Sequence, residues 1–429
     1  MIFALTFGMV ALLLIGAPVA MALALSSLAA LLLGGAPFHP AILSTKMQFG
    51  LQNFLLVGIP LFILAAKLMN TAGITAKIFR FADAIVGFLP GGLGHSNVIA
   101  SLIFSGMSGA AVVDAASLGQ IELDAMNKAG YPKKFSVAIT AGSSIIGPIF
   151  PPSIPMIVFS FASGVSVGRL FLGGVVPGLL MTLALMVMVT IYARRVDLPR
   201  EAFPTWARTA AAFIDAFLPM MTPVILLGCI WSGIVTPTEA AAIAVCYALL
   251  IGVFVMRELG PRALVTVFVE TAKESAIIGF IIAAASLFGW VLMRSGMTVQ
   301  IAETLLAFSS SPLVILLLIN LFLLLIGCFL DPTVSILIFA PIFLPVVTAV
   351  GIDPVHFGVV MVLNLMLGLL TPPFGIVLFV MVQISGMRFE DVVRATFPVL
   401  IPLFLVLALI IVFPVLVTGL PDLLMGVAR

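Results

Sequence analysis

Two pairs of consecutive prolines interrupt segments that are otherwise apolar, and polar side chains precede both pairs. Because proline has no backbone N–H, the carbonyl groups about one turn before each pair lose their helical partners. Unpaired carbonyl oxygens beside hydroxyl and amide oxygens suit Na⁺, which binds at unwound positions of membrane helices. The pattern predicts two cation sites, with these candidate ligands: Ser143, Ser144, Gly147 and Pro148 before Pro151-Pro152, and Asn364, Gly368 and Thr371 before Pro372-Pro373.

Two further segments, rich in small or polar residues, contain candidate site residues. The run Ser105-Gly-Met-Ser-Gly109 lies near the middle of a long apolar stretch, and Gly327–Thr333 lies in the corresponding place later in the chain. A helix that leaves such a turn begins with unpaired N–H groups and a positive dipole end, which can bind a carboxylate without a buried lysine. Ser105, Gly327 and Asp331 join the predicted Na⁺ ligands, and the predicted substrate-binding residues are Ser105, Gly106, Ser108, Gly109, Pro152, Ser153 and Pro373.

Simpler interpretations exist for these residues. A single glycine or proline in a membrane helix often provides only a kink or a close helix contact. Asp331 suits the N-cap of a helix that begins at Pro332, a role compatible with cation binding. Asp114 follows the first glycine-rich turn and could help a cation site or carry a proton, since carboxylates inside membranes tend to be functional. The pattern Gly-x-x-x-Pro-Pro occurs at both breaks, at Gly147 and at Gly368. Its presence in two copies favours a binding site over a simple kink.

Composition places the chain in the membrane. Hydrophobic residues make up 63% of its 429 residues, charged residues make up 8%, and the mean hydropathy is +1.34. These values lie outside the range of soluble globular domains and predict an all-α polytopic membrane protein in contact with lipid. The net charge of +2 argues against a nucleic-acid partner. No His/Cys cluster has metal-ligand spacing, and no organic cofactor is expected.

Five residues recur at a constant distance along the chain. Gly106, Gly130, Gly147, Pro151 and Pro152 are matched by Gly327, Gly351, Gly368, Pro372 and Pro373, each 221 positions later (327 − 106). Matching breaks in two halves of an apolar chain are typical of secondary transporters built from two repeats, in which broken helices hold ions and substrate. The sequence therefore predicts a transporter that consists of two internal repeats.

The predicted domains follow from this duplication. Residues 1–193 form the first repeat, with a re-entrant hairpin at 94–130 and a broken helix at 136–161. Residues 194–216 form a cytoplasmic linker with an amphipathic helix. Residues 217–429 form the second repeat, with a hairpin at 312–350 and a broken helix at 357–382. Within the second repeat, a surface segment at 261–269 is expected to be separate from a span at 275–293.

Positive charge predicts the orientation of the two repeats. Each repeat has an odd number of crossings, because its hairpin enters and leaves on one side, so the repeats must be inverted. With both termini outside, fifteen of the 19 Lys and Arg residues fall inside and four outside, as the positive-inside rule expects. The four outside are Lys46, Arg169, Arg294 and Arg429, and the linker charges Arg194, Arg195, Asp197, Arg200, Glu201 and Arg208 fall inside.

Four segments carry a resemblance to a known family. The runs Phe104–Gly119, Gly130–Pro132, Gly147–Pro155 and Leu367–Pro373 resemble the large membrane (permease) subunit of tripartite ATP-independent periplasmic (TRAP) transporters. The resemblance extends over essentially the whole chain. It implies an elevator-type carrier of the ion transporter superfamily, with a scaffold and a transport domain, in the bacterial inner membrane with both termini periplasmic. The implied cargo is a carboxylate, such as sialic acid or a dicarboxylate, taken up with Na⁺.

The resemblance also implies two protein partners. A periplasmic binding protein would deliver the substrate, and a small four-helix membrane subunit, expected as a separate polypeptide, would complete the permease. The two oxygen-rich breaks suggest two or more coupling Na⁺ ions. A stand-alone Na⁺/dicarboxylate symporter would use the same repeats and stays an alternative. A membrane-embedded enzyme is a more distant option, because the sequence shows no nucleophile–base set.

Overall fold

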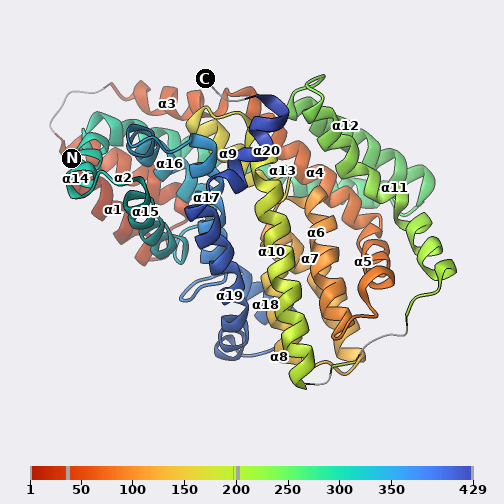
Figure 1. The fold of residues 1–429 in the computed structure, drawn as a ribbon. Helices are drawn as coiled ribbons and strands as arrows, with labels where there is room; N and C mark the ends of the chain where they lie inside the picture. The colour runs from red at the N-terminus through yellow and green to blue at the C-terminus, as the bar shows by residue number, and fades with distance from the viewer. Residues whose placement is uncertain (1, 35–38, 197, 200–202, 427–429) are drawn as a thin grey trace.

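The chain folds into helices that pack side by side (Figure 1). The computed structural model describes residues 2–34, 39–196, 198–199 and 203–426. No strand occurs within these ranges. The predicted positions of Asp197, Arg200, Glu201 and Arg429 lie outside the described residues.

Several helices are long and apolar enough to cross a membrane, which confirms the prediction of an all-α polytopic membrane protein. Within the described ranges there are seven: Phe54–Thr71, Val167–Val196, Trp206–Trp231, Pro237–Val255, Pro261–Arg294, Pro332–Ala349 and Phe389–Val412. The helices beside the predicted breaks are shorter. Depth and orientation in the bilayer stay predictions.

Several helices in the first half of the chain end next to a glycine or a proline, as predicted. Its elements are α1 (Ile2–Leu14), α2 (Val19–Leu33), α3 (Ala41–Leu51), a 3₁₀ turn (Phe54–Val57), α4 (Gly58–Thr71), α5 (Ile74–Val86), α6 (Gly92–Ser108), α7 (Ala111–Lys128), α8 (Lys133–Ser144), α9 (Ile154–Ser163) and α10 (Val167–Val196). The predicted hairpin at 94–130 corresponds to α6 and α7, and the predicted broken helix at 136–161 corresponds to α8 and α9, with ends that differ by two or three residues.

The second half has hairpin and broken-helix elements in the same order. Its elements are α11 (Trp206–Trp231), α12 (Pro237–Leu250), a π-helical turn (Ile251–Val255), α13 (Pro261–Arg294), α14 (Met297–Phe308), α15 (Pro312–Gly327), α16 (Pro332–Ala349), α17 (Pro354–Gly368), α18 (Ile376–Ser385), α19 (Phe389–Val412) and α20 (Val415–Met425). Here α15 and α16 lie in the predicted hairpin, while α17 and α18 cover the predicted broken helix at 357–382 and extend three residues beyond it at each end.

Two predicted boundaries are wrong. The segments 261–269 and 275–293 form one continuous helix, α13, because no glycine or proline separates them and four of the five residues at 270–274 are Glu, Ala or Lys, which are good helix formers. The boundary at 216 falls inside α11, which begins at Trp206 after the Thr205 side chain caps it by accepting from the Arg208 N–H at 3.4 Å. Residues 206–216, predicted to contain an amphipathic helix, therefore form one continuous helix with the residues that follow them.

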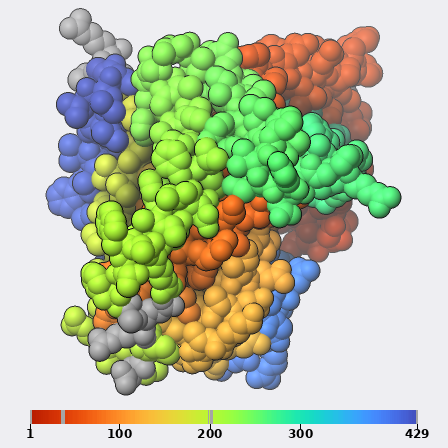
Figure 2. Space-filling view, turned by 90° about the vertical axis from the view of Figure 1, so that its right-hand side faces the viewer, coloured from red at the N-terminus to blue at the C-terminus, as the bar shows by residue number. Residues whose placement is uncertain are grey.

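The hairpin of each half packs against the broken helix of the other half. Helix α7 of the first hairpin contacts α18 after the second break, and α16 of the second hairpin contacts α9 after the first break. Helices α2, α3 and α4 each contact the long helix α13. Figure 2 shows α11 and α12, in green, lying above the first hairpin, in orange. The described chain therefore consists of an inner set of broken elements beside long intact helices.

Candidate functional site

The tip of the first hairpin is fixed against the first helix break. Gly109, which ends α6, has a φ of +61°, a conformation that favours glycine. Its carbonyl accepts a hydrogen bond from the Ile154 N–H at 3.3 Å. A Cβ at Gly109 would lie 2.5 Å from the Pro152 carbonyl oxygen, so no side chain fits there. Tip and break thus form one unit.

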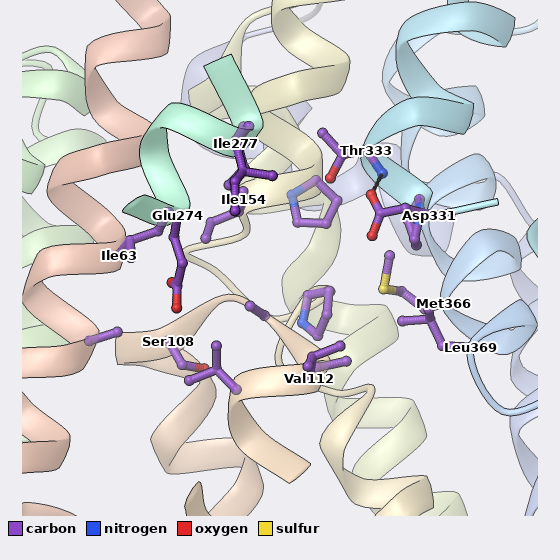
Figure 3. Close-up of a pocket in the computed structure, with 18 of the residues that line it drawn as sticks. Ile63, Ser108, Val112, Ile154, Glu274, Ile277, Asp331, Thr333, Met366 and Leu369 are labelled. Carbon is purple, nitrogen blue, oxygen red and sulfur yellow. Dashed lines mark hydrogen bonds between the residues drawn. The ribbon is translucent and has the colours of Figure 1, made fainter. Parts of the chain in front are cut away.

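A cavity of about 250 Å³ opens beside this unit. Figure 3 shows Ile63 and Glu274 on one side of it and Asp331 and Met366 on the other. Helices α4 and α13 therefore form one wall, and the hairpins and breaks form the other. The lining residues are Ile63, Ala66, Lys67, Ser108, Ala110, Ala111, Val112, Val113, Pro148, Ile154, Pro155, Glu274, Ile277, Ile278, Asp331, Pro332, Thr333, Met366 and Leu369.

Three helices begin at or beside this cavity, and only one of them lacks a side-chain cap. Ser153 caps α9 by accepting from the Met156 N–H at 3.2 Å. Asp331 caps α16 by accepting from the Thr333 N–H at 2.8 Å, which confirms the N-cap interpretation. No side chain caps α7, whose first residues, Ala111–Val113, line the cavity. The uncapped N–H groups of α7 therefore suit a carboxylate.

A buried carboxylate lies where the first cation site is predicted. Asp114 accepts a hydrogen bond from the Ser108 hydroxyl through Oδ1. Its Oδ2 is buried and has no hydrogen-bond partner among the described residues. A Cβ at Gly147 would overlap this same oxygen, so the carboxylate lies directly against the first break. An unpartnered buried carboxylate oxygen beside a helix break fits a cation ligand.

The second break also contains an unpartnered oxygen. The Asn364 Nδ2 donates to the Asn320 carbonyl at 2.9 Å and to Asn320 Oδ1 at 2.8 Å. Asn364 Oδ1 is buried without a partner in the described structure. The Thr371 hydroxyl donates to the Leu367 carbonyl at 2.8 Å, which leaves its oxygen lone pairs available. The side-chain oxygens of Asn364 and Thr371 suit Na⁺, which would bind here as a transported ion.

The structure brings only part of the predicted site to the cavity. Ser108, Pro148 and Asp331 line it. The other predicted residues do not, and Pro373 is exposed, unlike the buried Pro152. Those buried near the tips or breaks are Ser105, Gly106, Gly109, Ser143, Ser144, Gly147, Pro152, Ser153, Gly327, Asn364 and Gly368, while Thr371 is half-buried.

Two predicted serine hydroxyls donate to backbone carbonyls of their own helices, and one predicted glycine packs against another helix. Ser105 donates to the Leu102 carbonyl at 2.5 Å, and Ser144 donates to the Ala141 carbonyl at 2.9 Å. A Cβ at Gly106 would lie 2.5 Å from Pro223 Cβ on α11. At Gly106 the structure therefore shows close packing between helices.

A buried polar cluster went unrecognised in the sequence. The Asn97 amide donates to Glu122 Oε2 at 2.6 Å and to the Thr140 hydroxyl at 2.7 Å, while the Ser143 hydroxyl donates to Asn97 Oδ1 at 2.7 Å. All four residues are buried. The pair Asn320–Asn364 joins the second hairpin to the second broken helix in a similar way. The near-repeat spacing of Asn97 and Asn320 was the available signal.

Charged groups also line the intact wall of the cavity. Lys67 on α4 forms ion pairs with Glu270 at 3.1 Å and with Glu274 at 2.8 Å, both on α13. No local pattern indicates these ion pairs, because their partners lie about two hundred residues apart in the chain.

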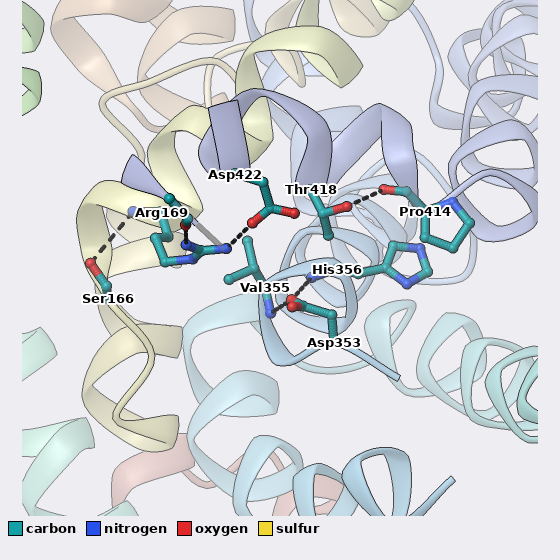
Figure 4. Close-up of polar contacts among 9 residues, drawn as sticks. Ser166, Arg169, Asp353, Val355, His356, Pro414, Thr418 and Asp422 are labelled. Carbon is teal, nitrogen blue, oxygen red and sulfur yellow. Dashed lines mark hydrogen bonds and ion pairs between the residues drawn. The ribbon is translucent and has the colours of Figure 1, made fainter. Parts of the chain in front are cut away.

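Another polar group, away from the first cavity, links helices to one another. Figure 4 shows Arg169 on α10 paired with Asp422 on α20. Asp353 caps α17 through the Val355 N–H at 2.7 Å. His356 Nε2 donates to the Ile410 carbonyl at 2.7 Å. These contacts join α10 to α20 and α17 to α19.

Comparison with known proteins settles the family. Residues 6–416 match the family described as "Tripartite ATP-independent periplasmic transporter, DctM component". The chain belongs to this family. It is 42% identical to the sialic acid TRAP transporter large permease protein SiaM of Vibrio cholerae, over 98% of each chain. It is 37% identical to the C4-dicarboxylate TRAP transporter large permease protein DctM of the same species, over 99% of this chain and 98% of that one.

The fold of this TRAP large permease is also similar to that of a solved transporter. The structure of the YdaH transporter of Alcanivorax borkumensis superimposes with a TM-score of 0.63 at 16% identity, over 87% of this chain and 88% of that one. At this identity the likeness concerns the fold alone. The chain is a multi-pass inner-membrane permease of a secondary transporter and not an enzyme.

Proposed function

We propose that this permease takes up a small organic carboxylate together with two or more Na⁺ ions. The observation that carries the proposal is the uncapped start of α7 in a cavity between the intact helices and the two breaks. Sialic acid and C4-dicarboxylates are the first candidates, because relatives at 42% and 37% identity bear these names. Both compounds contain the carboxylate that a helix N-terminus binds.

Na⁺ coupling is supported by the charges around the cavity. Asp331 lines the same cavity as the start of α7, so a bound carboxylate and this side chain would repel one another. A cation near Asp331 would remove this repulsion, which makes substrate and ion binding mutually favourable. The unpartnered oxygens of Asp114 and Asn364 lie at the two breaks and provide further ligands.

An elevator movement is supported by the composition of the two walls. One wall consists of the intact helices α4 and α13, and the other consists of hairpin tips and breaks that hold one another. A rigid unit that contains tips and breaks could carry the cargo past a fixed wall. We propose α6–α9 and α15–α18 as the transport domain, with α2–α4 and α11–α13 in the scaffold, in two inverted repeats.

The proposed partners follow from the tripartite family. A periplasmic binding protein would deliver the substrate to the outer face, and a small four-helix membrane subunit would bind the scaffold. Membership of the tripartite family does not favour the stand-alone symporter. In the proposed orientation both termini are periplasmic.

Reconstitution tests this proposal. The complete transporter in proteoliposomes should take up at least one acid from a panel of sialic acid, C4-dicarboxylates and 2-oxo acids. Uptake should require the matching binding protein and an inward Na⁺ gradient. Amide derivatives of the same solutes, which lack the carboxylate, should not be transported. Equal uptake without the binding protein would support the stand-alone symporter instead.

A further inference from the structure

A second cavity, of about 680 Å³, lies between the same two sets of helices. It is bounded by α3 and α13 on the scaffold side and by α9 and α16 on the other. Its scaffold wall contains Lys46 and Trp290. The predicted orientation places this cavity on the periplasmic side, since Lys46 and Arg294 are two of the four outside charges.

Two cations share one aromatic ring at this cavity. The Lys46 Nζ lies 5.5 Å from the centre of the Trp290 ring, and the Arg294 Cζ lies 5.4 Å from the same centre. Both distances are within the range of cation–π contacts. Lys46 comes from α3, whereas Trp290 and Arg294 lie one turn apart on α13. Both cations therefore contact the same aromatic ring.

No acid neutralises these charges in the part of the chain that the structure describes. The cavity lining contains Gln52, Asn53 and Ser286 as its other polar residues and no Asp or Glu. No described ion pair includes Lys46 or Arg294. Both charges would attract an anion at this end of the scaffold. The arrangement is suited to a carboxylate.

Helix α13 lines both cavities, at positions with opposite charge. Glu274 lies in the first cavity and Trp290 in the second, about 24 Å apart along the helix axis at 1.5 Å per residue. Around the first cavity, Lys67 is outnumbered by Glu270 and Glu274, so that wall is acidic. The scaffold is thus cationic at its outer end and acidic at its inner end.

We propose that Lys46, Trp290 and Arg294 form an outer recognition site for the carboxylate of the transported solute. This inference rests on the proposed function. The cations bind the carboxylate as it enters from the periplasm, while the transport domain faces outward. After the movement the same solute faces Glu270 and Glu274, which favour its release into the cytoplasm. The scaffold charges thereby favour binding of the anion on the outer side and its release on the inner side.

The test compares variants of the complete transporter in proteoliposomes. The variants are Lys46→Gln, Arg294→Gln, the double change, and the charge-keeping pair Lys46→Arg with Arg294→Lys. Arg262→Gln serves as the matched control, because it removes one exposed charge from the opposite end of α13. Uptake of radiolabelled solute is measured against the concentration of solute-loaded binding protein and against Na⁺.

The double change should lower the maximum uptake rate about tenfold or more, as expected for the loss of two charge-assisted contacts. The half-saturating concentrations of loaded binding protein and of Na⁺ should stay unchanged. Each single change should give a smaller loss, and the charge-keeping pair and Arg262→Gln should retain the wild-type rate.

Three results would overturn the inference. One is a wild-type rate in the double variant. Another is a raised half-saturating concentration of binding protein at a normal maximum rate, which would assign the charges to protein docking. The third is an equal loss in the charge-keeping pair, which would show that packing alone matters. If the double variant does not insert, the single variants decide in the same way. Failure of the proposed function is distinct, since wild-type protein would then transport no carboxylate.

Discussion

Gly327 and Gly368 pack backbone against backbone, where the tip of the second hairpin meets the second helix break. A Cβ on Gly368 would lie 2.5 Å from the carbonyl carbon of Gly327 and 2.6 Å from its oxygen. A Cβ on Gly327 would have its nearest neighbour at 3.4 Å, an ordinary contact. Both glycines belong to the set that recurs along the chain. Of these two, Gly368 has no room for a side chain, whereas Gly327 does.

This asymmetry predicts the effects of two matched substitutions. Gly368→Ala forces backbone apart and should destabilise the fold by about 1–3 kcal/mol, as overpacking does, with loss of transport. Gly327→Ala should retain transport, since its Cβ fits. Thermal unfolding in detergent and uptake in proteoliposomes measure both effects. Equal effects of the two changes would show that the glycines do not meet as described.

A second prediction concerns the oxygen at the second break. Thr371→Val deletes a candidate Na⁺ ligand and preserves the shape of the side chain. It should raise the Na⁺ concentration for half-maximal uptake several-fold, for a loss of about 1–2 kcal/mol. Thr396→Val is the control, because Thr396 makes the same kind of hydrogen bond, to the Val392 carbonyl at 2.9 Å, away from the breaks. An unaltered Na⁺ dependence of Thr371→Val would remove this residue from the site.

The Asn97 cluster gives a third prediction. Asn97→Ala leaves the buried side chains of Glu122, Thr140 and Ser143 without their shared partner. Stability should fall by about 1–3 kcal/mol, the cost of unsatisfied buried polar groups. Asn127→Ala, on the exposed surface of the same hairpin, should change it by about 0.5 kcal/mol or less. Denaturation curves that coincide for the two variants would argue against the cluster as a structural link.

The charge distribution predicts a topology that labelling can check. A cysteine at Arg195, at the exposed end of α10, should react with a membrane-impermeant reagent only after permeabilisation. A cysteine at Glu303, exposed on α14, should react in intact spheroplasts. Both reactivities depend on the orientation with outside termini. The reverse pattern would contradict the inverted arrangement.

The helix ends could be predicted because glycine and proline act locally. Helix α6 ends at Ser108, before Gly109 in the left-handed region, and α8 ends at Ser144, before the first Pro-Pro pair. The N-cap role of Asp331 could be predicted from the proline that follows it. The family resemblance was equally accessible, since its motifs are contiguous in sequence.

The contacts between distant segments could not be predicted in this way. The pairing of Asn97 with Ser143, and of Lys67 with Glu274, depends on how helices pack, which no local pattern specifies. The exposure of Pro373 against the burial of Pro152 shows that a repeated motif can meet different surroundings. The continuity of α13 is a further difference from the prediction, because four of the five residues at 270–274 are Glu, Ala or Lys, which favour helix.

Coupling of carboxylate uptake to Na⁺ is the central claim, and one electrical measurement tests it most directly. Two or more Na⁺ ions carried with a monoanion move net positive charge inward, and each charge gains about 2.3 kcal/mol per 100 mV. Proteoliposomes that contain the complete transporter, with an inward Na⁺ gradient, should take up the solute faster when an inside-negative potential is imposed. Uptake that responds neither to Na⁺ nor to the imposed potential would contradict the account.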